Sequence, residues 1–160
     1  MSLYDKIFSA DSIHQPLLLW KSLNKKIVFT NGCFDLLHKG HVDYLEKAKK
    51  LGDILIVGLN SDTSVSMIKG KNRPIQEEAG RLAVIAALEA VDATLTFSDS
   101  TPIELIKIIK PDVLCKGGDW PIEKIIGADF VQSYGGKVKT IPFINGYSTS
   151  KIEQKIRDQK

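Results

Sequence analysis

The sequence is poor in cysteine and has no long apolar segment. Its 160 residues include two cysteines, Cys33 and Cys115, both in apolar surroundings, which excludes a small fold held together by disulfides. The longest uncharged apolar run near the N-terminus, residues 15–20, is far shorter than the ~20 residues that cross a bilayer. No basic stretch followed by an apolar one opens the chain, so no secretory signal is expected. These absences predict a cytoplasmic protein with reduced thiols and no membrane partner.

The sequence also lacks a strong charge of one sign. Its 22 basic and 19 acidic residues give a net charge of +3, too small to favour a nucleic-acid partner. With 43% hydrophobic residues and no linker, repeat or low-complexity stretch, a chain of this length can bury a core of its own. Residues 1–160 are therefore predicted to form a single domain.

Short apolar runs alternate with segments of helical spacing. Val42, Leu45, Ala48 and Leu51 recur at three-residue steps, which is typical of an amphipathic helix. Strands alternating with helices predict a Rossmann-like, doubly wound α/β fold with a five-stranded parallel sheet. The five runs read as strands are residues 26–30, 54–59, 93–97, 113–116 and 138–141.

Helix signals mark the remaining boundaries. Residues 1–23 are expected to form a helical extension, broken near Gln15-Pro16, before an α/β core at residues 24–160. Residues 99–102 indicate a cap followed by a proline in the first helical turn, and residues 110–112 end that helix. Residues 148–157 predict a last helix that opens with hydroxyl residues.

Ligands of such a sheet bind beyond the carboxyl ends of the strands, so the segment after each strand is the place to look. After the first strand, Gly32 is expected to permit a tight turn and Gly40 to let a ligand approach the backbone. His38 and His41 are three residues apart and share one face of the following helical turn. Unpaired N–H groups at that helix start favour an anion.

Other interpretations of the two histidines stay open. One is that they are structural residues packed near an apolar helix. Another is a metal site made of Cys33, His38 and His41, although no fourth ligand is spaced to complete a tetrahedral set. The sequence contains neither a Walker A motif nor Gly-x-Gly-x-x-Gly, which excludes the two common glycine-rich phosphate-binding loops.

Three later segments could complete a phosphate site. Residues 69–73 carry three positive charges and no negative one, which fits either a solvated loop or a lid over a triphosphate. The paired glycines of residues 116–120 fit close packing of a base or ribose, or a plain turn. Residues 145–150 place hydroxyls before the last helix, either as a simple cap or as a second anion cradle.

The segment Gly32-Cys-Phe-Asp-Leu-Leu-His38-Lys-Gly-His41 resembles the signature of the HxGH nucleotidyltransferases, the superfamily of cytidylyltransferases and pantetheine-phosphate adenylyltransferase. Within it, residues 26–156 are most similar to the heptose 1-phosphate adenylyltransferases, free-standing or fused to a sugar kinase. Glycerol-3-phosphate cytidylyltransferases typically carry an arginine before their terminal hydroxyl motif, where this chain has Phe143-Ile-Asn-Gly. That difference argues against the cytidylyl relatives.

The resemblance implies transfer of AMP from ATP to D-glycero-D-manno-heptose 1-phosphate, giving ADP-heptose, a precursor of lipopolysaccharide or other glycans, and pyrophosphate. It further implies Mg²⁺ carried with ATP, a homo-oligomer, and a separate sugar kinase upstream. A cytidylyltransferase for glycerol 3-phosphate or another polyol phosphate remains an alternative. So does a nucleotide-binding regulatory module without catalysis.

Candidate site residues follow from the motifs and the resemblance. His38, His41 and Lys71 are expected to act in catalysis, and no protein side chain is expected to bind a metal. Asp35 is a candidate for sugar hydroxyls or, alternatively, for capping the turn that positions His38. The residues expected to bind the nucleotide and its phosphates are Thr30, Asn31, Gly32, Phe34, Gly40, Asn60, Asp62, Lys69, Arg73, Lys116, Gly117, Asp119, Tyr147, Ser148 and Thr149.

Overall fold

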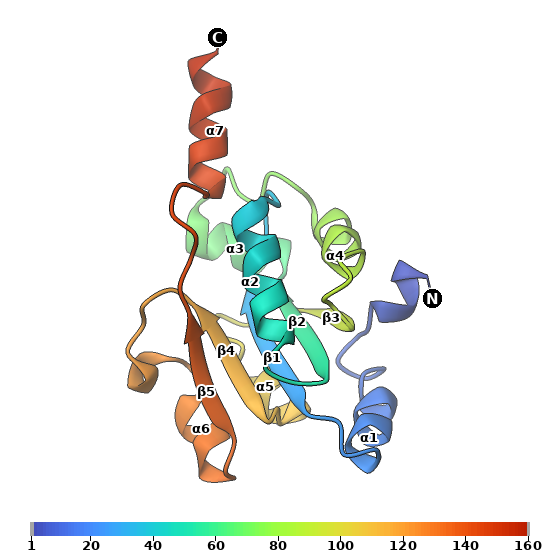
Figure 1. The fold of residues 1–160 in the computed structure, drawn as a ribbon. Coiled ribbons are helices and arrows are strands. Elements are labelled where there is room, and N and C mark those ends of the chain that lie inside the picture. Colours follow the sequence, from blue (N-terminus) through green and yellow to red (C-terminus); the bar gives the residue numbers. More distant parts are fainter. Residues whose placement is uncertain (1, 160) are drawn as a thin grey trace.

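The computed structural model describes residues 2–159 and is built on one parallel sheet with the strand order β3-β2-β1-β4-β5 (Figure 1). This confirms the predicted α/β fold and its five parallel strands. From β1 the chain winds outward through β2 and β3, then returns to place β4 on the other side of β1. The switch point between β1 and β4 is where such folds bind ligands. The strands are β1 Ile27–Gly32, β2 Ile54–Asn60, β3 Ala93–Phe97, β4 Val113–Gly117 and β5 Lys137–Ile141.

Helices cover both faces of the sheet. Helices α2 (Lys39–Lys49) and α4 (Glu78–Ala86) enclose one apolar cluster with side chains of β1, β2 and β4. Helices α1 (His14–Ser22), α5 (Ile103–Ile109) and α6 (Ala128–Ser133) enclose a second cluster on the opposite face. Because successive side chains of a strand point to opposite faces, Val28 belongs to the first cluster and Phe29 to the second.

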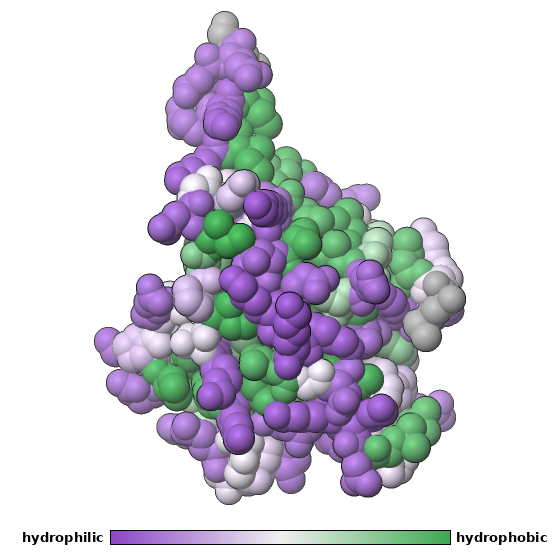
Figure 2. Space-filling view, viewed as in Figure 1, coloured by the Kyte–Doolittle hydropathy of each residue, from purple (hydrophilic) through white to green (hydrophobic). Residues whose placement is uncertain are grey.

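The remaining elements are short or peripheral: the 3₁₀ turns η1 (Leu3–Lys6) and η2 (Ile122–Lys124), and helices α3 (Asp62–Lys69) and α7 (Thr149–Asp158). Helix α7 projects from the body of the domain (Figure 1), and none of its residues is buried. Figure 2 shows hydrophobic residues along one side of α7 and hydrophilic residues on the other. None of the helices within residues 2–159 is both long and apolar enough to cross a membrane.

The N-terminal extension differs from the prediction. Its helical part is interrupted between η1 and α1, where Ile7 forms a bridge to Thr94 of β3, rather than near Gln15-Pro16. Pro16 lies in the first turn of α1, where a missing N–H leaves no helix bond unmade. At α5 the proline prediction also shifts by one place, because Pro102 is the N-cap itself and no side chain caps this helix.

Strand β1 is longer than predicted and changes the role of Gly32. The strand continues through Asn31 to Gly32, and the chain turns at Phe34, whose φ is 47°. A Cβ on Gly32 would lie 2.9 Å from the Phe34 ring. The prediction that Gly32 makes a tight turn was therefore wrong: glycine is needed here to admit the aromatic ring.

Candidate active site

A cleft of about 700 Å³ opens at the carboxyl ends of the strands, between the first turns of α2 and α7 and the segments that follow β1, β2 and β4. The fold thus brings together the segments singled out in the sequence. The predicted residues that line this cleft are Asn31, Gly32, Phe34, Asp35, His41, Asn60, Lys69, Arg73, Lys116, Gly117 and Thr149.

The two histidines stack at the start of α2. Their ring centroids are 3.8 Å apart and the planes differ by 20°. His38 is the N-cap residue, and its Nδ1 accepts a hydrogen bond of 3.1 Å from the Gly40 N–H. An accepting Nδ1 leaves Nε2 as the protonated, donating nitrogen of the neutral ring.

Gly40 has a different role from the one predicted. A Cβ there would lie 2.9 Å from Cε1 of His38 and 3.2 Å from Cβ of Tyr147. Glycine therefore makes room for the capping residue His38 and for Tyr147. These two side chains, and not open space for a ligand, lie next to Gly40.

Burial keeps the histidines neutral in the structure as it stands. It lowers the pKa of His41 to about 4, with the neighbouring His38 adding to the effect. Burial also lowers the pKa of His38. A phosphate placed against the pair would favour the charged imidazolium and raise both pKa values. The site can therefore take up a proton when an anion enters.

Asp35 anchors the segment after the basic loop. Its carboxylate accepts hydrogen bonds of 2.9 Å from the backbone N–H groups of Ile75 and Gln76, and one of 3.1 Å from Arg73. Burial alone would raise the pKa of Asp35, but these bonds hold it below its usual value. Asp35 thus holds the segment at Ile75 and Gln76 while it borders the cleft, and its predicted role toward sugar hydroxyls stays a prediction.

Arg73 is neutralised from two sides. Besides Asp35, its guanidinium forms an ion pair with Glu153 of α7. The side chain borders the cleft and is only 17% exposed. The basic loop therefore presents Lys69 to the cleft, while Arg73 ties this loop to the last helix.

Thr30 and Asp62 are not among the residues that line the cleft, and their predicted roles toward the nucleotide stay predictions. Thr30 is fully buried and its hydroxyl is bonded to that of Tyr44 at 2.6 Å. Asp62 forms an ion pair of 2.8 Å with Arg81 and accepts a bond from the Glu78 N–H. Both side chains hold the framework of the site together.

Arg81 is a buried residue behind the cleft that the sequence analysis did not single out. It is 1% exposed, and it donates to the backbone carbonyls of Cys33 and Gln76 as well as to Asp62. The guanidinium therefore ties the exit of β1 to α4. One signal was available: Arg81 and Ile85 are four residues apart and share the buried face of α4.

Six other predicted residues are not among those that line the cleft: His38, Gly40, Lys71, Asp119, Tyr147 and Ser148. Lys71 and Asp119 are exposed, and Ser148 is the N-cap of α7, with its hydroxyl accepting from the Lys151 N–H at 3.1 Å. Tyr147 is 44% exposed, with its ring centroid 6.5 Å from that of His38. Their roles toward a nucleotide remain predictions.

Three aromatic residues that were not among the predicted site residues also line the cleft. They are Tyr44, Trp120 and Phe143. A Cβ on Gly117 would clash with the Phe143 ring, so glycine is needed here to admit that ring at the edge of the cleft. Aromatic pocket residues of this kind have no spacing that could identify them in a single sequence.

Comparison with known proteins places these features in a family. The cytidylyltransferase-like family model matches residues 29–155. This span runs from β1 to the first turns of α7, and it includes the residues that line the cleft.

The chain belongs to the cytidylyltransferase-like family.

Several curated proteins resemble this family member. It is 50% identical over 151 residues to the bifunctional protein HldE of Geobacter metallireducens, covering 94% of this chain and 31% of the relative. It is 52% identical over 153 residues to HldE of Wolinella succinogenes (96% and 31%) and 53% identical over 149 residues to HldE of Campylobacter jejuni subsp. jejuni (93% and 32%). The chain thus spans about a third of the length of these relatives.

A solved structure shares the cytidylyltransferase-like fold. The lipopolysaccharide core biosynthesis protein from Thermoplasma volcanium GSS1 superposes with a TM-score of 0.61 at 33% sequence identity. The match covers 78% of this chain and 99% of that one. The likeness therefore extends over nearly the whole of a shorter protein.

Proposed function

We propose that this chain transfers AMP from ATP to D-glycero-D-manno-heptose 1-phosphate, releasing pyrophosphate and forming ADP-heptose. The observation that carries the proposal is the stacked His38–His41 pair at the start of α2, beside a cleft of about 700 Å³. The similarity to the bifunctional HldE proteins and to a lipopolysaccharide core biosynthesis protein supports the heptose substrate.

The reaction needs no general base. A deprotonated phosphate oxygen of the sugar 1-phosphate attacks the α-phosphorus of ATP and forms the new P–O bond. The bond from the α-phosphorus to the oxygen bridging it to the β-phosphorus breaks, and pyrophosphate leaves with that oxygen and the electron pair. Catalysis then depends on positioning the two substrates and neutralising the charge of the leaving group.

Residues on the α2 side of the cleft would perform that neutralisation. His38 can donate through Nε2, because the Gly40 N–H fixes its tautomer, and His41 can become an imidazolium against the triphosphate. Lys69 and the start of α7 at Thr149 border the same space. Lys71 and Arg73 would join them only when the loop rearranges around the nucleotide.

Mg²⁺ is proposed to arrive with ATP. Within residues 2–159, no group of three or more His, Cys, Asp or Glu side chains is placed to hold a metal ion. The oxygens of the triphosphate would therefore supply most of its ligands, as is usual for this ion with nucleotides. The metal would add positive charge at the phosphates, while the side chains hold and orient them.

The other expected partners belong to the same proposal. A sugar kinase must supply the heptose 1-phosphate, and the HldE relatives are themselves bifunctional chains about three times as long. A homo-oligomer and a cytoplasmic location also remain proposals.

The test is a matrix of the four nucleoside triphosphates against heptose 1-phosphate, hexose 1-phosphates and glycerol 3-phosphate, read by pyrophosphate release with Mg²⁺ present. We expect turnover to be highest for ATP with heptose 1-phosphate and to fall by ~10²–10³-fold in His41→Ala. Highest turnover for CTP with glycerol 3-phosphate would make the chain a cytidylyltransferase instead. ATP binding without pyrophosphate release for any acceptor would favour a regulatory module.

A further inference from the structure

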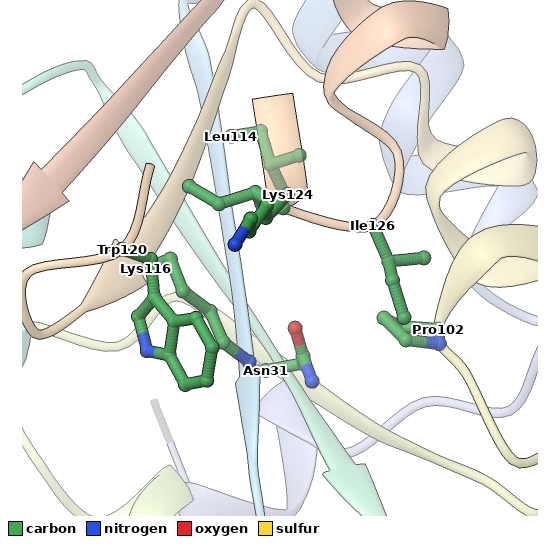
Figure 3. Close-up of a pocket in the computed structure, with 8 residues that line it drawn as sticks. Asn31, Pro102, Leu114, Lys116, Trp120, Lys124 and Ile126 are labelled. Atoms are coloured by element: carbon green, nitrogen blue, oxygen red, sulfur yellow. The ribbon is translucent and has the colours of Figure 1, made fainter. Parts of the chain in front are cut away.

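Arg73 differs from the other basic side chains of the cleft. The cleft is lined by Lys69, Arg73 and Lys116, and Lys116 also borders a smaller recess of about 240 Å³ (Figure 3). Within residues 2–159, neither lysine forms an ion pair, whereas Arg73 forms two, with Asp35 and with Glu153 of α7. An anion that enters the cleft therefore meets two unpaired lysines and one arginine that already has protein partners.

The two carboxylates that neutralise Arg73 are held in different ways. Asp35 is buried and also accepts hydrogen bonds from the backbone N–H groups of Ile75 and Gln76. Glu153 belongs to α7, which buries no residue, and its side chain is 26% exposed. Because Asp35 is fixed by three donors and Glu153 lies on a projecting helix, Glu153 is the partner that can move away.

Both members of the Arg73–Glu153 ion pair have a second partner. Nη1 of Arg73 donates to Asp35, and Nη2 donates to Oε2 of Glu153. The other carboxylate oxygen of Glu153, Oε1, accepts from Arg157, four residues later on α7. When the pair separates, Arg73 keeps Asp35 and Glu153 keeps Arg157. Separation therefore avoids the large cost of leaving a half-buried charge unpaired.

The same ion pair is a main link between α7 and the rest of the domain. Within residues 2–159, one other side-chain hydrogen bond joins them, a bond of 3.4 Å from Thr149 to the Leu36 carbonyl. Thr149 and Ser150 of the first turn line the cleft, as Arg73 does. Glu153 follows one turn later. A polyphosphate in the cleft and Glu153 on α7 therefore compete for one guanidinium.

Resting on the proposed function, we propose that the triphosphate of the bound nucleotide replaces Glu153 as the partner of Arg73 and so releases α7 from the basic loop. Nη2 of Arg73 then donates to a phosphate oxygen, and a charge-assisted bond is made in both states. Because the coupling of two binding events is reciprocal, the contact that holds α7 lowers the affinity for the nucleotide by the same factor. Glu153 sets this affinity without touching the substrate.

The decisive variant is Glu153→Gln, which keeps the shape of the side chain and removes its charge. The probes are ATP and inorganic tripolyphosphate, each with Mg²⁺, and the dissociation constants are measured by titration calorimetry. We expect both ligands to bind roughly three- to fivefold more tightly, the effect of losing one competing ion pair of this exposure.

Glu77→Gln is the matched control. Glu77 is exposed, lies four residues after Arg73 and makes no side-chain bond at the start of α4. Within residues 2–159 it takes part in no ion pair. Its replacement removes the same charge close to the same loop, and both ligands should bind as they do to the wild type.

A double-mutant cycle separates competition for Arg73 from a general effect of charge. Arg73→Met lowers the affinity for tripolyphosphate by itself. In that background Glu153→Gln should change the affinity no further, because no guanidinium remains to be freed. A gain of the same size with and without Arg73 would mean that Glu153 acts only through its long-range charge, which would overturn the proposal.

Amide hydrogen exchange reports the release of the helix. In the wild type, ATP should speed exchange in residues 151–158. In Glu153→Gln, exchange should already be faster without ATP and should change little when ATP is added. Slower exchange in the wild type on binding ATP would mean that the nucleotide fastens α7, which would overturn the proposal.

The outcomes also distinguish this proposal from the proposed reaction. Weaker ATP binding in Glu153→Gln would make Glu153 a support of the cleft wall and overturn the exchange of partners. Unchanged ATP binding together with normal pyrophosphate release would overturn the exchange and leave the reaction standing. Tighter binding that depends on Arg73, without pyrophosphate release for any acceptor, would support the exchange and overturn the reaction.

Discussion

Helices α2 and α7 both begin at the cleft, yet the chain holds them in different ways. Helix α2 buries Gly40, Tyr44, Leu45 and Ala48 against the sheet, whereas α7 buries no residue. Each start is capped by its own N-cap side chain, His38 in one and Ser148 in the other. Both helices thus begin with a side-chain N-cap, but α2 is packed in the core and α7 projects from it.

Packing decides what each helix start can contribute. The histidines of α2 are held in place before any ligand arrives, which is the condition under which charged groups stabilise a transition state most. Helix α7 is tied to the domain by the Arg73–Glu153 ion pair and by a bond of 3.4 Å from Thr149 to the Leu36 carbonyl. A helix with so few buried contacts belongs to the less stable part of a domain.

The largest expected effect tests the α2 side. His41→Ala removes a preorganised partner of the triphosphate and should lower kcat for pyrophosphate release by ~10²–10³-fold. The fold should persist, as checked by circular dichroism, because the histidine sits at the helix start. Thr149→Ala at the α7 start is the matched comparison and should lower kcat much less. Near-normal turnover in folded His41→Ala would show that the helix start is not catalytic.

The second largest effect is expected from Arg81, whose hydrogen bonds join the end of β1 to α4. Arg81→Met leaves Asp62 and two backbone carbonyls without their partner and should destabilise the protein by about 3 kcal/mol. Arg157→Met on α7, where the side chain is 68% exposed, should change the free energy of unfolding by less than about 0.5 kcal/mol. Urea unfolding of both variants measures the difference. Equal stabilities would mean that the Arg81 network does not hold the site.

Acid should lower the stability of the folded protein through His41 at the start of α2. The pKa of His41 is about 4 in the folded protein against 6.5 for the free side chain, so the unfolded chain binds the proton first as the pH falls. Stability from the neutral, buried ring is present above pH 6.5 and is lost as the pH falls toward 4. The melting temperature should fall across this range, and less steeply in His41→Gln. Identical slopes in both proteins would contradict the assignment.

The smallest effect is expected from a change at the N-cap of α7. Ser148→Ala removes the N-cap acceptor of the Lys151 N–H and should destabilise this helix by about 1 kcal/mol. Because α7 buries nothing, the loss should appear as faster amide exchange in residues 149–158 while the melting temperature of the domain stays the same. A lower melting temperature would mean that α7 is part of the cooperative core.

The sequence predicted the fold well because its signals are local. Apolar runs such as residues 93–97 match β3 residue for residue, and the hydroxyl cap before α7 is confirmed in place. The partners of individual side chains were harder to predict. Asp35 and Arg73 lie in segments that the sequence assigned to substrate binding, yet in the structure they form an ion pair with each other. The sequence pattern does not show whether a charged side chain will pair with another residue of the protein or stay free for a ligand.

By itself, then, the sequence determined the five parallel strands and the place of the two histidines after the first of them, because apolar periodicity and the alternation of strands and helices follow from residues close together in the chain. Tertiary structure alone decided which glycines admit aromatic rings, which charges are already paired, and that Arg81 is buried beneath the site. It also placed Glu153 of α7 beside Arg73. These facts depend on contacts between distant segments, and only packing in three dimensions determines them.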